Sequence, residues 1–352
     1  MNPARYPLLD REECGLAQRT RYRTQDRDRV GRAFGLARHP GAGVQQTTIA
    51  QRVACNGSGL HSGEKVELAL LPAPAQSGIV FVLRGAAADG GDVEIPARSG
   101  AVTSTARATT LSRRIETGSG RTENVMINTV EHLLATLFAF AIDNVRIEVS
   151  GSEMPVMDGS AAPFVDLVLH AGRRVLSAQR RVVRVVEPLE IRDGNRWIRV
   201  EPADSLRISY AIEFSHPCIG RQTMEIADFH EAVFRKEIAA ARTFGFVDEV
   251  EVLRRAGLAQ GGSFENTLVL DDSRILNADR LRWPDEFVRH KVLDLIGDLS
   301  LLGAALEGHV RVERGGHSLH HRVVRALAER PQLLEPGVDE SAIGPIFGEA
   351  AR

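Results

Sequence analysis

The residues best suited to chemistry lie between Phe287 and Leu299, in a segment whose apolar residues have helical spacing. His290 and Asp294 are four residues apart, so on a helix both side chains project from one face and can bind one metal ion. Asp298 is one turn further along this stripe, where its carboxylate can accept a hydrogen bond from an imidazole. The many apolar neighbours predict a buried helix. Because buried charges need partners, a solvated charged face is the weaker interpretation.

A second candidate pair, Glu131 and His132, lies in a helical pattern over residues 128–140. Adjacent side chains diverge by about 100° on a helix, so the two would not bind one metal well. The divergence suits a division of labour, with His132 as a ligand and Glu131 as the general base for a water molecule. The alternative is a polar helix start, where a glutamate favours the helix macrodipole.

The third candidate is His317, which follows two glycines that allow close approach of the backbone to a site. The alternative is an ordinary surface histidine, and we assign the nearby His320 and His321 to the surface. Two neutral histidines and one aspartate would make a three-ligand set with an open fourth position, as in catalytic zinc sites. The same ligand types hold non-haem iron, so the pattern does not separate Zn²⁺ from Fe²⁺.

The composition limits the classes of partner. The chain has 44 basic and 46 acidic residues, so its net charge of −2 provides no strong field for nucleic acid or an anionic membrane surface. Only three of the basic residues are lysines, and one of them, Lys291, follows His290. This placement suggests that a compact ammonium group is needed there, since the chain otherwise uses arginine.

The three cysteines are too few for a disulfide framework or a CxxC metal site, and they indicate reduced thiols in the cytoplasm. No segment approaches the roughly 20 apolar residues of a membrane span, and no apolar core of a secretory signal follows Arg5. We expect a cytoplasmic monomer with no membrane span and no nucleic-acid partner.

The elements that must position these residues fall into two halves. Residues 1–45 and 336–352 are predicted as a mobile leader and a tail, and a polar run at 171–181 as a linker between domains at 46–175 and 181–335. Strands are expected at 48–53, 66–70, 145–149, 182–186 and 197–201, and helices at 128–140, after 160, at 229–241, at 285–302 and, briefly, after 317. Strands first and helices late in each half favour an α+β class over βαβ alternation. Asn128 or Thr129 and Ser160 are expected helix caps.

The motifs together resemble a known family, the UDP-3-O-acyl-N-acetylglucosamine deacetylases, which are zinc amidases of bacterial lipid A synthesis. The resemblance covers roughly residues 47–334, and it rests on motifs at 59–63, 129–133, 157–164, 241–246, 287–299 and 316–317. It implies two similar domains, each a two-layer α/β sandwich, with the active site between them.

The resemblance also implies the roles of individual residues. It implies three zinc ligands, namely His132, His290 and Asp294. It implies five further catalytic residues: Glu131 as general base, His317 as the imidazole that assists the leaving amine, Asp298 as its support, and Thr243 and Lys291 near the oxyanion.

For the substrate, the resemblance implies a hydrophobic passage for the 3-O-acyl chain, formed by an insert after Phe244. Its candidate lining residues are Val250, Leu253 and Ala259, which are ordinary core residues in the alternative interpretation. Three residues match family positions that contact the nucleotide or its phosphates: Phe214, Arg196 and Arg314. At the two arginines the family pattern has lysine; arginine can also bind phosphate, but in a bidentate manner.

The expected reaction is hydrolysis of the N-acetyl group of UDP-3-O-acyl-N-acetylglucosamine to acetate and the free amine. One alternative is another metal enzyme with a two-histidine, one-aspartate site, such as an Fe(II) oxygenase. A second is a catalytically silent metal-binding module. Glu131 and His317 argue against the module, because a structural metal site has no use for an acid–base pair.

Overall fold

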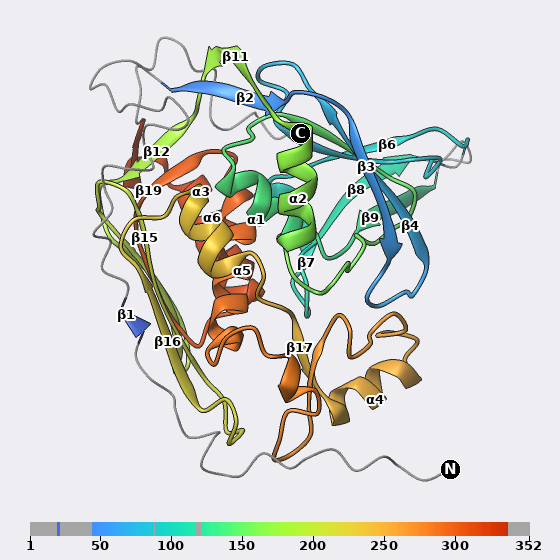
Figure 1. The fold of residues 1–352 in the computed structure, drawn as a ribbon. Coiled ribbons are helices and arrows are strands. Elements are labelled where there is room, and N and C mark those ends of the chain that lie inside the picture. Colours follow the sequence, from blue (N-terminus) through green and yellow to red (C-terminus); the bar gives the residue numbers. More distant parts are fainter. Residues whose placement is uncertain (1–19, 22–43, 88, 117–120, 337–352) are drawn as a thin grey trace.

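The computed structural model describes residues 20–21, 44–87, 89–116 and 121–336 (Figure 1). The predicted leader and tail therefore lie almost entirely outside the described residues. Within these ranges the chain combines several sheets with helices, which confirms the predicted α+β class. None of the helices in the described ranges is long and apolar enough to cross a bilayer.

The first half of the chain forms a five-stranded sheet in the order β3-β4-β10-β5-β6. Its strands are β3 (Val53–Ser58), β4 (Lys65–Pro72), β5 (Ile79–Leu83), β6 (Val93–Pro96) and β10 (Val145–Val149). β4 and β10 pair antiparallel, and β10 alternates buried apolar residues with less buried polar ones, as the sequence predicts. A second, three-stranded sheet contains β7 (Val102–Ser104), β8 (Thr110–Glu116) and β9 (Thr122–Ile127).

The second half forms a larger sheet around β19 (Ala305–Glu313). β19 is parallel to β12 (Val182–Val185) and β15 (Leu206–Glu213) and antiparallel to β14 (Arg196–Glu201). The remaining members are β13 (Leu189–Asp193) on β14, β16 (Arg221–Ile226) on β15, β20 (Leu334–Pro336) on β12 and β1 (Thr20–Arg21) on β16. The predicted strands at 182–186 and 197–201 are thus present.

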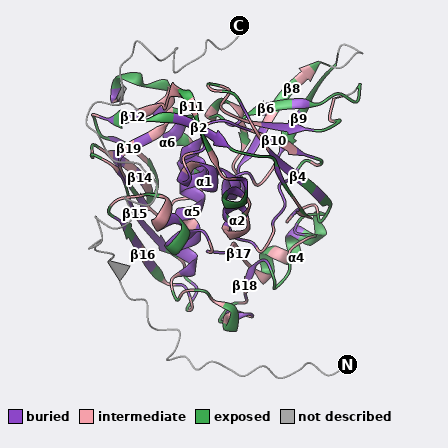
Figure 2. Cartoon of the chain, turned by 45° about the horizontal axis from the view of Figure 1, so that its top comes forward, coloured by how far each residue is buried: buried purple, intermediate pink, exposed green. Residues whose placement is uncertain are grey.

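Three helices lie between the strands of the two halves: α1 (Glu131–Ala139), α5 (Glu286–Ser300) and α6 (His317–Glu329) (Figure 1). α5 is almost wholly buried, as predicted (Figure 2). Lys291 is the only residue of α5 that is not buried. α1 crosses α5 at Gly297, where a Cβ atom would overlap the Glu131 carbonyl oxygen. Glycine at this position therefore lets the two helix backbones approach closely.

The other helices flank this centre. They are α2 (Ala162–Ala171) and α3 (Glu231–Val233), which continues into a π-helical turn (Phe234–Ile238). An insert contains β17 (Phe244–Phe246), α4 (Val247–Arg255) and β18 (Leu268–Leu270), with β17 parallel to β18. Single turns of 3-10 helix occur at Ser99–Ala101, Ala278–Arg280 and Pro331–Leu333.

Several local predictions differ from the structure. The polar run at 171–181 is mostly β11 (Arg173–Gln179), which pairs antiparallel with β2 (Gln45–Ile49), because a ladder satisfies its backbone groups. The strand predicted at 48–53 instead spans the bend between β2 and β3. The last helix is predicted to be short, but α6 begins at His317 and has 13 residues. The division into two domains remains a prediction.

The predicted helix caps differ from the structure at both helices. Neither Asn128 nor Thr129 caps α1, whose cap position is Val130 with no side-chain hydrogen bond. The Asn128 amide instead donates to the Ser152 carbonyl. The cap position of α2 is Ala161, also with no side-chain hydrogen bond, although the preceding Ser160 Oγ accepts the Ala162 N–H.

Candidate active site

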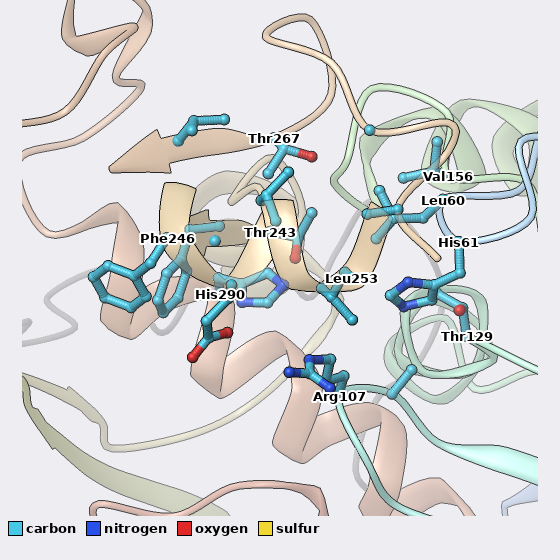
Figure 3. A pocket seen from close by; sticks show the side chains of 18 of the residues that line it. Leu60, His61, Arg107, Thr129, Val156, Thr243, Phe246, Leu253, Thr267 and His290 are labelled. Carbon is cyan, nitrogen blue, oxygen red and sulfur yellow. The ribbon is translucent and has the colours of Figure 1, made fainter. Parts of the chain in front are cut away.

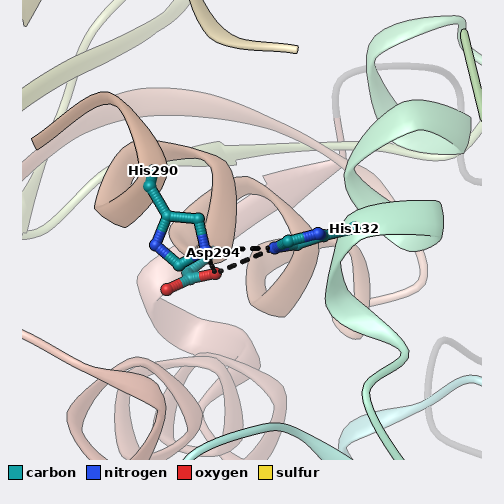
Figure 4. Close-up of side chains that lie close together, drawn as sticks. All are labelled: His132, His290 and Asp294. Atoms are coloured by element: carbon teal, nitrogen blue, oxygen red, sulfur yellow. Dashed lines mark hydrogen bonds and ion pairs between the residues drawn. The ribbon is translucent and has the colours of Figure 1, made fainter. Parts of the chain in front are cut away.

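Helices α1 and α5 bring three potential metal ligands together (Figure 4). His132 Nε2 lies 3.2 Å from His290 Nε2. Asp294 Oδ1 lies 3.6 Å from the first of these nitrogens and 3.5 Å from the second. The ligand atoms of the predicted set therefore converge on one point, and the i, i+4 spacing on α5 accounts for two of them.

The same three residues fit a divalent metal ion. All are buried, yet Asp294 Oδ1 and His290 Nδ1 have no hydrogen-bond partner within the described part of the chain. Buried polar atoms are nearly always satisfied, so an unpaired carboxylate oxygen aimed at two imidazole nitrogens fits the binding of a cation. Burial lowers the pKa of His290 well below its usual value, and the neutral imidazole is the form that binds metals.

Lys291 extends from the same helix to the edge of the site. Its Nζ lies 3.0 Å from Asp294 Oδ2 and 5.4 Å from the centre of the Phe244 ring. Burial raises the pKa of the Asp294 carboxyl, but the imidazoles and this ammonium around it hold the pKa well below its usual value. Asp294 is therefore a carboxylate, with one oxygen paired to Lys291 and the other left for a cation.

Glu131 and His317 lie close to Asp294 and to each other, with one polar atom of each of the three side chains within 4.8 Å of the others. His317 Nε2 is 4.0 Å from Glu131 Oε1 and 3.8 Å from Asp294 Oδ2. Burial raises the pKa of the Glu131 carboxyl, although the imidazoles of His317 and His132 oppose this. Burial lowers the pKa of His317, but Asp298 and Asp294 outweigh it and raise the pKa to about 10. The pair thus combines a carboxylate that is a stronger base than usual with an imidazolium that can donate a proton.

Asp298 lies behind His317, where the spacing argument expects it. Its Oδ2 accepts a hydrogen bond from His317 Nδ1 at 2.8 Å, and its Oδ1 accepts one from Thr109 Oγ1 at 2.5 Å. Burial raises the pKa of Asp298, but the charge of His317 and hydrogen bonds from His317 and His320 outweigh it and lower the pKa to about 2. The carboxylate stays ionised and orients the imidazole so that Nε2 faces Glu131.

The assignment of His320 to the surface is wrong. The side chain is fully buried, and its Nδ1 lies 2.9 Å from Asp298 Oδ2. His320 is three residues after His317 on an amphipathic helix, so both face the core. His321, on the neighbouring face, is partly exposed.

The metal-ligand cluster opens into a cavity of about 760 Å³ whose further walls are apolar (Figure 3). The three residues predicted for the acyl chain, Val250, Leu253 and Ala259, all line it. Phe214 also lines it, with its ring 5.7 Å from that of Phe244. The insert of β17, α4 and β18 supplies most of the apolar wall.

Thr243 lines the cavity just before this insert, and its backbone is fixed from both sides. The Thr243 N–H donates to the Gly159 carbonyl, and the Thr243 carbonyl accepts the Leu268 N–H, each at 2.9 Å. Gly159 has a φ of 84° and abuts a backbone carbonyl that leaves no room for a side chain. Next to Thr243, Arg242 forms a buried ion pair with Glu286 at the start of α5, which ties this segment to the ligand-bearing helix.

Two predicted residues lie apart from the cluster. Arg196, the first residue of β14, pairs with Asp193 at the end of β13. Arg314 pairs with Glu213. Neither is among the residues that line the cavity, so of the predicted nucleotide contacts only Phe214 lies there.

Sequence reasoning missed Thr109, which connects the acid and the base. Its backbone N–H donates to Glu131 Oε2 at 3.1 Å, while its hydroxyl donates to Asp298. No local pattern marks this residue, because its contacts are made with α1 and α5. His61 was also missed. It lines the cavity, and its backbone N–H donates a hydrogen bond to Glu153 Oε1 at 2.8 Å. The motif at 59–63 was the available signal.

Comparison with known proteins gives a consistent result. Residues 46–329 match the family described as UDP-3-O-acyl N-acetylglycosamine deacetylase. A protein of Oleidesulfovibrio alaskensis named UDP-3-O-acyl-N-acetylglucosamine deacetylase is 47% identical over 298 residues, which are 85% of this chain and 93% of the relative. Proteins of the same name from an Anaeromyxobacter species and from Idiomarina loihiensis are 46% and 44% identical, over 83% and 86% of this chain and 90% and 96% of the relatives.

Proposed function

Because the chain belongs to the UDP-3-O-acyl N-acetylglycosamine deacetylase family, we propose that it removes the acetyl group of UDP-3-O-acyl-N-acetylglucosamine in lipid A biosynthesis. The products are acetate and the UDP-3-O-acyl-glucosamine that carries the free amine. The observation that carries the proposal is the convergence of His132, His290 and Asp294 beside an acid–base pair at the polar end of an apolar cavity.

We propose that these three residues hold Zn²⁺, with Fe²⁺ as the second candidate because the same ligand types bind it. A divalent ion bound there supplies Lewis acidity, which polarises an amide carbonyl and lowers the pKa of a water molecule. Metal analysis of the purified protein, combined with the oxygen dependence of turnover, distinguishes a zinc hydrolase from an Fe(II) oxygenase.

Glu131 is the proposed general base. As a water oxygen attacks the acetamide carbon, the Glu131 carboxylate takes one of its protons, and the raised pKa of this carboxyl makes it a better acceptor. His317 is the proposed general acid: its Nε2 proton goes to the sugar nitrogen as the carbon–nitrogen bond breaks. Asp298 keeps the Nδ1 side of His317 occupied, so the proton available for transfer is on Nε2.

Thr243 and Lys291 are proposed to stabilise the oxyanion that forms on the acetamide oxygen. Within the described residues the Thr243 hydroxyl makes no hydrogen bond, so it is available to donate one. The ammonium of Lys291 adds positive charge at the cavity wall. Such preorganised donors favour the transition state over the neutral amide.

The apolar part of the cavity is proposed to bind the 3-O-acyl chain through Val250, Leu253 and Ala259. Phe214 is the proposed contact of the nucleotide end. Arg196 and Arg314 remain predicted diphosphate contacts, and each would first have to leave its present carboxylate partner. The predicted monomeric state and cytoplasmic location also remain predictions.

The direct test incubates the purified chain with UDP-3-O-acyl-N-acetylglucosamine and measures acetate and free amine together. We expect equal amounts of the two products, loss of both with a chelator, and recovery on adding Zn²⁺. Metal-replete protein that binds the UDP-sugar but releases no acetate would refute the proposed function.

A further inference from the structure

His320 is a fully buried titratable residue that the proposed reaction does not use. Its Nδ1 lies 2.9 Å from Asp298 Oδ2, the oxygen that also accepts a hydrogen bond from His317 Nδ1. Its Nε2 lies 3.0 Å from the hydroxyl of Tyr210, on β15. His320 therefore connects the Asp298–His317 pair to the sheet of the second half.

The chemistry of the partners fixes the direction of each hydrogen bond. An ionised carboxylate can only accept, so His320 Nδ1 carries the proton that faces Asp298. Burial lowers the pKa of His320, which leaves the ring neutral with a lone pair on Nε2. Burial raises the pKa of the Tyr210 hydroxyl well above its usual value, so Tyr210 keeps its proton and donates it to Nε2.

Gly315 provides the space for this arrangement. A Cβ atom at Gly315 would lie 2.8 Å from the Tyr210 hydroxyl oxygen and 3.1 Å from His320 Nε2, and it would also overlap the Val312 side chain. The adjacent Gly316 has no heavy atom near its corresponding position. Of the two glycines before His317, Gly315 is therefore the one that the Tyr210–His320 contact requires.

We propose that His320 and Tyr210 are positioning residues of the active site, which fix the Asp298 carboxylate and, through it, the orientation of His317. Asp298 accepts three hydrogen bonds, from His317, His320 and the Thr109 hydroxyl. Two of the donors come from α6 and the third from the residue before β8, and together they engage both carboxylate oxygens, which restricts rotation of the carboxylate. His317 then presents Nε2 toward Glu131 and Asp294.

This inference rests on the proposed function for its kinetic consequence. Loss of the His320 donor should lower kcat by about 10-fold to 100-fold, the usual effect of removing a group that orients a catalytic or metal-binding residue. KM should stay unchanged, because neither His320 nor Tyr210 is among the residues that line the cavity.

The test compares two variants of similar side-chain size, His320→Leu and His320→Asn. Both lose the contact with Tyr210, but the asparagine amide can still donate to Asp298 from the position of Nδ1. We expect H320N to keep most of the wild-type kcat and H320L to show the whole decrease of about 10-fold to 100-fold. The two variants should have equal metal content and equal unfolding temperatures. Equal kcat in the two variants, or losses of kcat that follow the unfolding temperature, would show that His320 only fills space.

A second measurement does not depend on turnover. Metal-free protein labelled with ¹⁵N-histidine should show His320 as a neutral ring protonated on Nδ1, and Tyr210→Phe should perturb this signal and lower kcat by a smaller factor than H320L. A ring protonated on Nε2, or a Y210F variant with unchanged His320 signals and unchanged kcat, would overturn the inference even if the His320 variants fail to fold. If the wild-type protein releases no acetate, the proposed function fails, while the tautomer of His320 still decides this inference.

Discussion

His132 Nε2 and His290 Nε2 lie 3.2 Å apart although the two residues are 158 positions apart in the chain. They come from different helices, and the Asp294 carboxylate faces both. This closeness depends on the crossing of α1 and α5, where Gly297 packs directly on the backbone of Glu131. The proposed metal ligands, the proposed base Glu131 and the helix crossing therefore form one structural unit.

Replacing Gly297 with alanine should disrupt this unit. The added methyl group would collide with a backbone carbonyl, which cannot rotate away, so the helices must separate. We expect a loss of about 1–3 kcal/mol in the free energy of unfolding, typical of overpacking, together with weaker metal binding. Denaturant unfolding measures the first and metal titration the second. Gly100→Ala is the control, because its Cβ position is open, and a G297A variant as stable as G100A would contradict the packing argument.

Metal binding should stabilise the folded chain through the three proposed ligands. A ligand at 100 times its Kd stabilises by about 2.7 kcal/mol, so adding Zn²⁺ to metal-free protein should raise the unfolding temperature. His290→Ala should abolish this shift. His309→Ala is the matched control, since His309 lies on β19 and bonds to Ser209 away from the cluster. A zinc-induced shift that survives in H290A but not in H309A would place the metal elsewhere.

The pH dependence of kcat/KM should have two limbs. Glu131 must be ionised, so activity should rise with pH through its raised pKa. His317 must be protonated, so activity should fall as pH rises toward its pKa of about 10. A bound divalent cation lowers this second value. Rates measured over about pH 5 to 10 test both limbs, and His317→Gln should remove the alkaline one. An alkaline limb that persists unchanged in H317Q would assign it to another group.

Substitutions in α4 should affect binding of the acyl chain only on the helix face that lines the cavity. Leu253 is buried and lines the cavity, whereas the adjacent Val252 is 62% exposed. Leu253→Trp should lower kcat/KM for a long-chain substrate by about 10-fold or more, since it fills space that the chain occupies, and should affect a short-chain substrate less. Val252→Trp should change neither. Equal effects of L253W on both substrates would argue against an acyl passage at this wall.

The proposed metal ligands on α5 could be paired from the sequence, because residues four apart share a helix face in any fold. His132 could be named as a candidate ligand from its own segment, but only the resemblance to a family joined it to His290, because their approach is a tertiary contact. His320 could have been placed correctly from its spacing to His317 on an amphipathic helix. Thr109, just before β8, and Tyr210, in β15, could not, because their local sequences give no sign of the side chains that will face them.

In the proposed reaction, Glu131 and the cluster of His132, His290 and Asp294 act together on an acetamide. Glu131→Gln tests this, because it keeps the size and polarity of the side chain and removes only the base. We expect metal content and unfolding temperature like those of the wild-type protein, and kcat lower by about 10²-fold or more.

The most direct measurement is therefore acetate release from UDP-3-O-acyl-N-acetylglucosamine by wild-type and E131Q protein, with metal content determined on the same samples. We expect steady release by metal-replete wild-type protein and near-complete loss in E131Q at equal metal content. Undiminished release by E131Q would contradict the proposed role of Glu131.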